Sequence, residues 1–438
     1  MTEATAAATE SRLVRALGTW ALAASIVNVT VGGGIFRLPA EMARLQGNSA
    51  LWAYLVCALA MGLIVLCFAD AGSRVSLTGG PYAYVETAFG PFVGFLSGVL
   101  LWAVGTFALA AVSTVLADSV AALVPALGSP AAKAGVLVAA YTLLAWVNIG
   151  GVKQGARLND VATVAKLLPL LVLVAAGAFA IRPDYVAATA PDTGGLARAC
   201  IVLIFAFAGV ESALVPSGEV RNPARTVPRA ILTAMLGITL LYLALHAVAQ
   251  GVLGSAALGA TATPLADAAG RALGPGGRAL ILVGAAISTF GYVSGMMLAV
   301  PRAPFAMARD GFLPRRLASV HPRFHTPHVA IAFQAVITCA LAVSSQFILL
   351  AVLANLSTLL LYAACCVAAW ELRRRGVATG GGTPFRVPAA PVIPWLALAV
   401  IGFMLFSVTL TEWAWVIGVL AVAAALFFAT RGSRAART

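Results

Sequence analysis

The sequence predicts an all-α membrane protein with twelve transmembrane helices. Three observations lead to this class: 61% of the 438 residues are hydrophobic, only 10% are charged, and apolar runs of span length recur along the whole chain. A soluble protein carries about 25% charged residues, and a disordered chain is poor in apolar ones, so both classes are excluded. One span needs roughly 20 apolar residues, so twelve spans fit within this length.

The apolar runs place the spans in order along the chain. They are expected near residues 17–45, 49–70, 90–122, 132–150, 156–181, 196–218, 229–253, 278–308, 329–345, 347–372, 393–410 and 413–430. This order gives an N-terminal tail, a first and a second set of five helices, a further pair of helices and a C-terminal tail, over residues 1–16, 17–181, 196–372, 393–430 and 431–438.

The charge distribution predicts the orientation of the chain. The net charge is +13, and twelve spans place both termini on one side of the membrane. Most of the Lys and Arg residues between the spans fall on that same side, which the positive-inside rule identifies as the cytoplasm. We therefore expect a multi-pass protein of the cell (inner) membrane with both termini cytoplasmic. A nucleic-acid partner is not expected, because the basic residues lie in short loops between spans.

A glycine triplet interrupts the first span. Gly32, Gly33 and Gly34 lie near the middle of its apolar run, and Pro39 follows. Glycine disfavours a helix interior, so three in succession predict an unwound segment. Close packing between helices through small residues is the alternative, but it explains a single glycine better than a triplet. Irregular backbone at membrane depth occurs where it lines a cavity or is buried in protein.

The sixth span carries a second interruption and a carboxylate. Gly209 lies within its apolar run, Glu211 follows two residues later, and Pro216 comes next. A carboxylate inside a membrane is a candidate functional group by default, although a structural ion pair or a bond to freed backbone amides is the alternative.

The two interruptions lie in the first helix of each five-helix set. Because five is odd, the second set runs inverted relative to the first. Matching breaks in inverted halves indicate a substrate site at the bilayer midplane. Helix N-termini offer amides that suit a carboxylate, and helix C-termini offer carbonyls that suit an ammonium group. An α-amino acid carries both groups close together.

Lys166 is a cation inside the fifth span. Its side chain could extend to the interface. Alternatively it is buried, where desolvation disfavours the ammonium form, and it then exchanges a proton during transport or takes the place of a bound Na⁺.

Four segments resemble the amino acid–polyamine–organocation (APC) superfamily, in family order and over nearly the whole chain. They are VGGGIF, SLTGGPYAYVETAFGPFVGF, FAGVESALVPSGEVRNPARTVPRA and PRAPFAMARDGFLPRRLASVHPRFHTPHVAI. The resemblance implies a five-plus-five inverted repeat (the leucine-transporter fold) with two C-terminal helices, and alternating-access secondary transport of amino acids or amines.

The resemblance also implies roles for particular residues. Backbone amides of Gly32, Gly33 and Gly34 would bind the substrate carboxylate, with Val31 and Ile35 on either side. Carbonyls of Ala208 and Gly209 would bind the amino group. The remaining expected site residues are the aromatic gate Phe205, the helix 8 aromatic Tyr292, and the coupling residues Lys166, Glu211, Ser288 and Thr289.

Two departures from the arginine/agmatine antiporters of this superfamily favour a neutral substrate. Leu109 stands where those antiporters have an asparagine, and they lack the lysine found here at position 166. A proton-linked or exchanging carrier of neutral amino acids is therefore expected, and a cationic amino acid or polyamine antiporter is the alternative. Arg37, just after the first break, faces an outer vestibule or pairs with Glu41 one helical turn on.

Other classes of function have less support in the sequence. No HExxH, GxSxG or Walker-type motif occurs, so an intramembrane enzyme is not expected. A channel is disfavoured because an enclosed site suits stepwise carriage. His321, His325 and His328 lie in a basic, proline-containing loop, and we expect neither a metal site nor a cofactor there. The sequence does not predict an oligomeric state.

Overall fold

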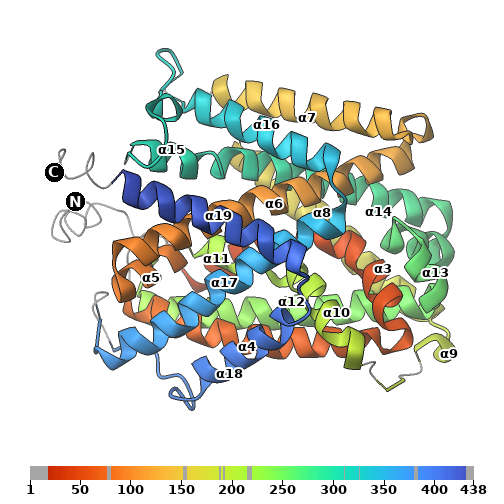
Figure 1. The fold of residues 1–438 in the computed structure, drawn as a ribbon. Coiled ribbons are helices and arrows are strands. Elements are labelled where there is room, and N and C mark those ends of the chain that lie inside the picture. The colour runs from red at the N-terminus through yellow and green to blue at the C-terminus, as the bar shows by residue number, and fades with distance from the viewer. Residues whose placement is uncertain are drawn as a thin grey trace.

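The computed structural model describes residues 18–430, except 76–79, 151–154, 187–188, 191–192, 215–219, 310, 325 and 379–382. The predicted tails, 1–16 and 431–438, lie outside the described residues, as do Pro216 and His325. The part of the chain that is described is helical throughout and contains no strand. Its long helices run side by side across Figure 1.

The helices begin and end close to the predicted positions. The principal ones are α2 (Thr19–Thr30), α3 (Gly34–Gln46), α4 (Ala50–Arg74), α5 (Pro81–Phe89), α6 (Pro91–Leu123), α7 (Pro130–Gly150), α8 (Gly155–Gly177), α9 (Pro183–Val186), α10 (Thr193–Phe207), α11 (Val210–Ala213), α12 (Pro223–Leu253), α13 (Ser255–Ala260), α14 (Pro264–Ala299), α15 (Arg302–Arg309), α16 (His328–Ser344), α17 (Phe347–Arg374), α18 (Ile393–Leu405) and α19 (Leu410–Ala429).

The helices differ in how readily they would span a membrane. Seven segments of the described chain are long and apolar enough, and five shorter apolar helices of 10–17 residues accompany them. Two of the shorter ones, α2 and α10, end at the predicted breaks, because unwinding divides what would otherwise be one long helix. The protein is thus helical with several candidate membrane spans, and the twelve-span count stays a prediction.

Some helical segments of the described chain lie where the sequence predicts loops, and α5, α13 and the start of α14 are among them. α5 and α13 are short helices of 9 and 6 residues, and neither contains an apolar run long enough to identify it. α14 begins at Pro264, well before the expected start of its span, and is kinked at Gly274, which has a φ of +75°. The dipeptide Gly274–Pro275 is typical of a loop, but here it bends a continuing helix.

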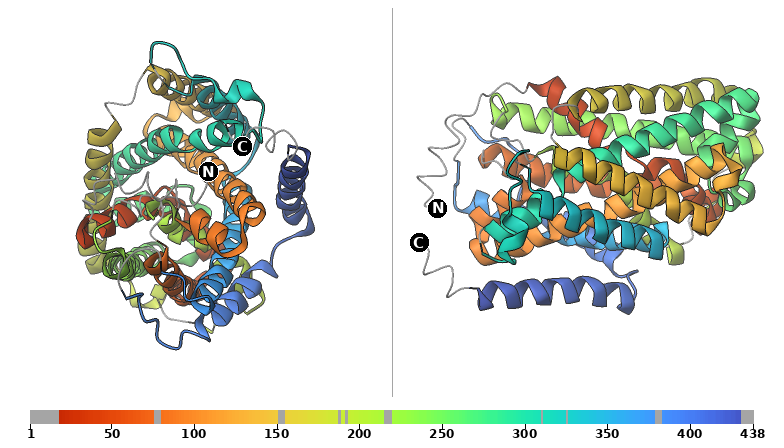
Figure 2. Two further views of the ribbon diagram at one scale, coloured as in Figure 1. Left: turned by 90° about the vertical axis from the view of Figure 1, so that its left-hand side faces the viewer. Right: turned by 90° about the horizontal axis from the view of Figure 1, so that it is seen from above.

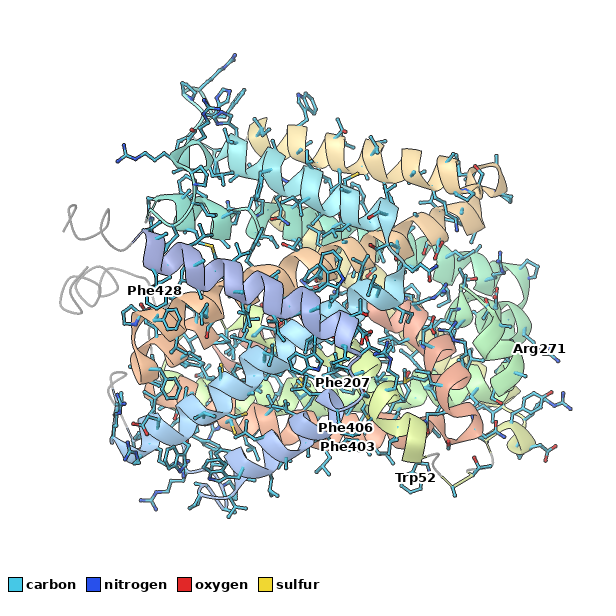
Figure 3. The ribbon with its side chains drawn as sticks, in the orientation of Figure 1. Trp52, Phe207, Arg271, Phe403, Phe406 and Phe428 are labelled. Atoms are coloured by element: carbon cyan, nitrogen blue, oxygen red, sulfur yellow. The ribbon has the colours of Figure 1, made fainter. Side chains whose placement is uncertain are left out.

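The long helices surround a buried centre and turn apolar side chains outward. α6 packs against α17, α14 packs against both α6 and α8, and α7 packs against α16 at the upper edge of Figure 1. Phe207 is fully buried, whereas Phe403, Phe406 and Phe428 have exposed side chains (all four are labelled in Figure 3). An apolar periphery is expected of a protein whose outer surface contacts lipid.

α19 lies at the edge of the bundle but is joined to a central helix. It stands apart from the main body in the right-hand view of Figure 2 and packs on α6 and α17. Its first turn forms a capping box between Thr409 and Glu412. The Glu412 carboxylate also accepts two hydrogen bonds, of 2.8 and 3.0 Å, from the Arg198 guanidinium of α10. This paired geometry is the strong form of an Arg–carboxylate contact.

Candidate functional site

The first break separates α2 from α3 at the glycine triplet. Val31 follows the end of α2, and its ψ of 78° lies outside the helical range. The Gly32 amide donates a 2.8 Å hydrogen bond to the Thr30 carbonyl, which closes the end of α2 in a tight turn. Because α3 begins at Gly34, the first amides of that helix have no preceding helical turn to donate to.

The second break separates α10 from α11. Between Phe207 and Val210 the chain leaves the helix, and Gly209 has a φ of +122°. Only glycine adopts this backbone conformation without strain, so Gly209 is required by the shape of the break itself.

The two breaks are in direct contact. A Cβ atom added to Gly209 would lie 3.2 Å from the Cα of Thr30, and one added to Gly34 would lie 2.8 Å from Cδ1 of Phe205. A Cβ on Gly33 would lie 2.6 Å from Cγ1 of Val112, on α6. Gly209 therefore lets the backbones of the two breaks approach each other, and Gly33 and Gly34 leave room for the side chains of Val112 and Phe205.

Tyr242 of α12 joins both breaks through one hydroxyl group. Its oxygen lies 2.8 Å from the Ala206 carbonyl of α10 and 3.1 Å from the Thr30 carbonyl of α2. A carbonyl freed by helix unwinding needs such a donor inside the membrane. Sequence reasoning missed this residue, and the available signal was a tyrosine in the middle of a predicted span rather than at its end.

A cavity of about 450 Å³ lies at the breaks. Eight of the predicted site residues line it: Gly32, Gly33, Gly34, Phe205, Ala208, Gly209, Glu211 and Tyr292. Val31 and Ile35 do not, since both side chains are fully buried in the surrounding core. The volume falls within the usual range of a small-molecule site.

Glu211 is fixed within the cavity wall. Its side chain is buried, and Oε2 accepts a 2.5 Å hydrogen bond from the Tyr362 hydroxyl of α17 and a 2.9 Å bond from the Gly209 amide. The carboxylate thus joins the second break to α17. Of the two alternatives drawn from the sequence, the bond to a freed backbone amide is present, and it leaves the group facing the cavity.

Three hydroxyl or carbonyl oxygens of the cavity wall have no hydrogen-bond partner among the described residues. They are Thr30 Oγ1 on α2 and Asn355 Oδ1 and Thr358 Oγ1 on α17. The Asn355 amide nitrogen donates a 2.6 Å bond to the Ile201 carbonyl, so its oxygen is left for another donor. Buried polar atoms without partners are costly, so these oxygens are candidate contacts for a polar ligand.

Known proteins resemble this chain over most of its length. The family model described as amino acid permease matches residues 17–438. The chain belongs to the amino acid permease family.

Curated relatives of the permease match over most of their lengths, and three are from Bacillus subtilis (strain 168). The serine/threonine exchanger SteT is 30% identical over 88% of this chain and 89% of its own. The branched-chain amino acid permease BcaP is 28% identical over 92% and 90%, and a methylthioribose transporter is 28% identical over 95% and 93%. The family and these relatives are transporters rather than enzymes, and the permease is a multi-pass membrane protein.

The permease holds Lys166 inside the protein. The residue is buried, and its ammonium group donates to the Asn28 carbonyl in the last turn of α2. Lys166 therefore joins α8 to the helix that ends at the first break instead of extending to the interface. Ser288 and Thr289 of α14 are also buried. The Ser288 hydroxyl has no hydrogen-bond partner within the described part of the chain, and that of Thr289 donates within its own helix. None of these three residues lines the cavity.

Arg37 belongs to a charged cluster one turn beyond the first break. Its Nε lies 3.5 Å from Oε1 of Glu41, and its Nη1 lies 3.6 Å from Oδ2 of Asp118 on α6. Nη1 also donates a 3.1 Å bond to the Ala262 carbonyl, just before α14. The expected pair with Glu41 is confirmed, and the cluster also joins α3 to α6 and to the connection between α13 and α14.

Gly33→Val tests the need for bare backbone at the first break. The added side chain would overlap Val112, whose branched side chain has little freedom to move, and would enter the cavity. We expect loss of amino acid binding, measured by thermal shift, in a protein that still folds. Gly237→Val is the control, because Gly237 is exposed on α12 with no atom within 4 Å of an added Cβ. Binding by Gly33→Val at the native affinity would contradict the role of Gly33.

Tyr242→Phe tests the hydroxyl that joins the breaks. Two carbonyls at membrane depth would lose this donor, so we expect about a tenfold loss of substrate affinity. Tyr54→Phe is the matched control, since Tyr54 is fully buried on α4 and its hydroxyl has no hydrogen-bond partner in the residues that the structure describes. Isothermal titration of the purified variants measures both effects, and an equal change in the two variants would show that the bridge is unimportant.

Proposed function

We propose that the permease is a secondary active transporter of neutral α-amino acids that works by alternating access. The observation that carries this proposal is the cavity at the meeting point of the two breaks. The first amides of α3 border it on one side, and the end of α10 borders it on the other. The amides of α3 stabilise a carboxylate, and the carbonyls at the end of α10 stabilise an ammonium group. These are the two charged groups of a zwitterion.

The wall of the cavity supports a substrate with an uncharged side chain. Among its described lining residues, Glu211 is the only Asp, Glu, Lys, Arg or His, and Oε2 of its carboxyl already accepts two hydrogen bonds. Leu109, which replaces an asparagine of the arginine/agmatine antiporters, is buried and does not line the cavity. Two of the relatives are named for serine/threonine and for branched-chain amino acids, which also favours neutral amino acids.

A cationic amino acid or polyamine antiporter is the second candidate. The position of Glu211 in the cavity wall favours it, because a carboxylate there could stabilise a second positive charge. The neutral substrate is preferred because no further described acidic residue lines the cavity.

The proposed architecture is twelve spans: two inverted sets, 17–181 and 196–372, with 393–430 added. The packing of the helices supports the repeat. When each helix is replaced by its counterpart in the other set, pairs of helices that are in contact become other pairs that are also in contact. The contact of α6 with α17 becomes that of α14 with α8, and the contact of α12 with α2 becomes that of α4 with α10. The inner membrane and cytoplasmic termini are supported by the basic residues of the loops.

Counterflow in proteoliposomes tests the function. Vesicles loaded with an unlabelled neutral amino acid, such as L-serine or L-leucine, should accumulate the same labelled compound transiently, because a carrier exchanges bound substrates. L-lysine, agmatine and putrescine are the competing arms, and exchange of these alone would favour the second candidate. A channel would equilibrate the label without any overshoot.

Lys166 variants test the link to protons. If the lysine exchanges a proton during transport, Lys166→Met should flatten the dependence of uptake on pH, and Lys166→Arg, which keeps a permanent charge, should flatten it as well. If the lysine instead acts as a fixed cation, Lys166→Arg should keep the native profile while Lys166→Met loses uptake. A native profile in both variants would assign Lys166 a purely structural role.

A further inference from the structure

The cavity extends from the breaks along α6 and α14 toward the end of these helices that is proposed to be cytoplasmic. Val112 lies beside Gly33, and the lining continues through Ala108 and Gly105 to Trp102. Val112 lies ten residues after Trp102 on α6, a distance of roughly 15 Å along the helix. A substrate released from the breaks to the cytoplasm therefore has to pass Trp102.

Trp102 is the one aromatic residue at this end of the cavity among the lining residues that are described. The others there are aliphatic or small: Leu101, Met296, Ala299, Val300 and Ala303. Residues 101, 102, 296 and 303 are half-buried, as expected where a cavity approaches the protein surface. The indole thus offers the largest apolar contact along this part of the wall.

A buried amide on α16 holds the indole in place. Gln334 Oε1 accepts a 2.9 Å hydrogen bond from Trp102 Nε1, and Gln334 Nε2 donates a 3.1 Å bond to Thr106 Oγ1, one turn along α6. The Thr106 hydroxyl in turn donates a 2.9 Å bond to the Trp102 carbonyl. The ring of Phe333 also lies nearly parallel to the indole, at an angle of 13°.

The position of Gln334 is informative because its helix is otherwise apolar at this depth. The residue is completely buried, and burying an amide in a membrane span is costly unless all its groups are paired. Contact between α16 and α6 would need only apolar packing. The Gln334 amide binds both the indole nitrogen of Trp102 and the hydroxyl of Thr106 in the next turn, and it thereby also fixes the orientation of the ring.

We propose that Trp102 is a selectivity residue for release at the cytoplasmic side, and that Gln334 is the positioning residue that holds its ring. The indole contacts the side chain of an amino acid as it leaves the breaks and favours bulky apolar side chains over small polar ones. This role rests on the proposed function, because it requires that amino acids pass through the cavity.

The test is exchange in proteoliposomes of known protein orientation, with half-saturation concentrations measured separately at the two faces. L-leucine and L-serine are the probes. For L-leucine, Trp102→Ala should raise the value at the cytoplasmic face about tenfold relative to the outer face. For L-serine, the same ratio should change less than about twofold, because a small polar side chain gains little from the ring.

Two further variants separate positioning from stability. Gln334→Leu removes the amide with little change of volume. It should raise the half-saturation concentration of L-leucine at the cytoplasmic face about threefold relative to the outer face. In the double variant Trp102→Ala/Gln334→Leu the shift should equal that of Trp102→Ala alone, because Gln334 acts through the ring. Trp146→Ala is the control, since Trp146 lies on α7 with 72% of its surface exposed, and it should change neither ratio.

Each outcome decides between the alternatives. Equal shifts at both faces or for both amino acids, or an additive double variant, would overturn the roles of Trp102 and Gln334 while leaving the proposed function intact. A wild-type protein that exchanges neither amino acid would overturn the proposed function and this inference with it. If Trp102→Ala does not fold, Trp102→Leu supplies the same comparison with a smaller loss of volume.

Discussion

The structure depends on one constraint: backbone amides and carbonyls inside a membrane need hydrogen-bond partners. A continuous helix meets this need internally, and a broken helix does not. Two helices of the permease are interrupted, and the two breaks lie against each other. Some of the freed backbone groups therefore find hydrogen-bond partners in nearby residues. The Gly32 amide donates to Thr30, the Gly209 amide donates to Glu211, and the Tyr242 hydroxyl lies between carbonyls of both helices. The amides and carbonyls that still need a partner face the cavity, where a polar ligand can form hydrogen bonds with them.

This constraint explains the residues that surround the breaks. Glycine is needed where neighbouring side chains press on the chain, as at Gly33 and Gly34, and where φ is positive and another backbone approaches, as at Gly209. Glu211 and Lys166 are charged residues of a kind that is rare in membrane spans. Glu211 accepts a hydrogen bond from Gly209 in the second break, and Lys166 donates one to Asn28 in the helix that ends at the first break. The same requirement applies to Gln334, whose amide is paired on both sides by α6.

Much of the fold could be predicted because span length, loop charge and glycine runs are local properties of the sequence. The two breaks and Glu211 followed from such patterns, and Phe205, Ala208 and Tyr292 were expected from the family resemblance, whereas α5 and α13 were missed because short helices leave no long apolar run. Asn355, Thr358 and Tyr362 could not be predicted, and for Tyr242 the sequence offered only its place in the middle of a predicted span. Their positions at the breaks or in the cavity wall depend on how distant helices pack, and their spacing within their own helices carries no trace of it. Val31 and Ile35 were expected at the site because they flank the triplet, but their side chains turn into the core.

The bond between Arg198 and Glu412 has a mechanical consequence. α10 carries the second break at its inner end, and Arg198 near its other end is bound through two nitrogens to the first turn of α19. In the proposed twelve-span architecture, any tilt of α10 therefore has to displace the start of a helix that lies largely among lipid chains, or else break the bond. The viscosity and thickness of the surrounding bilayer thus become part of the resistance that α10 meets when it moves.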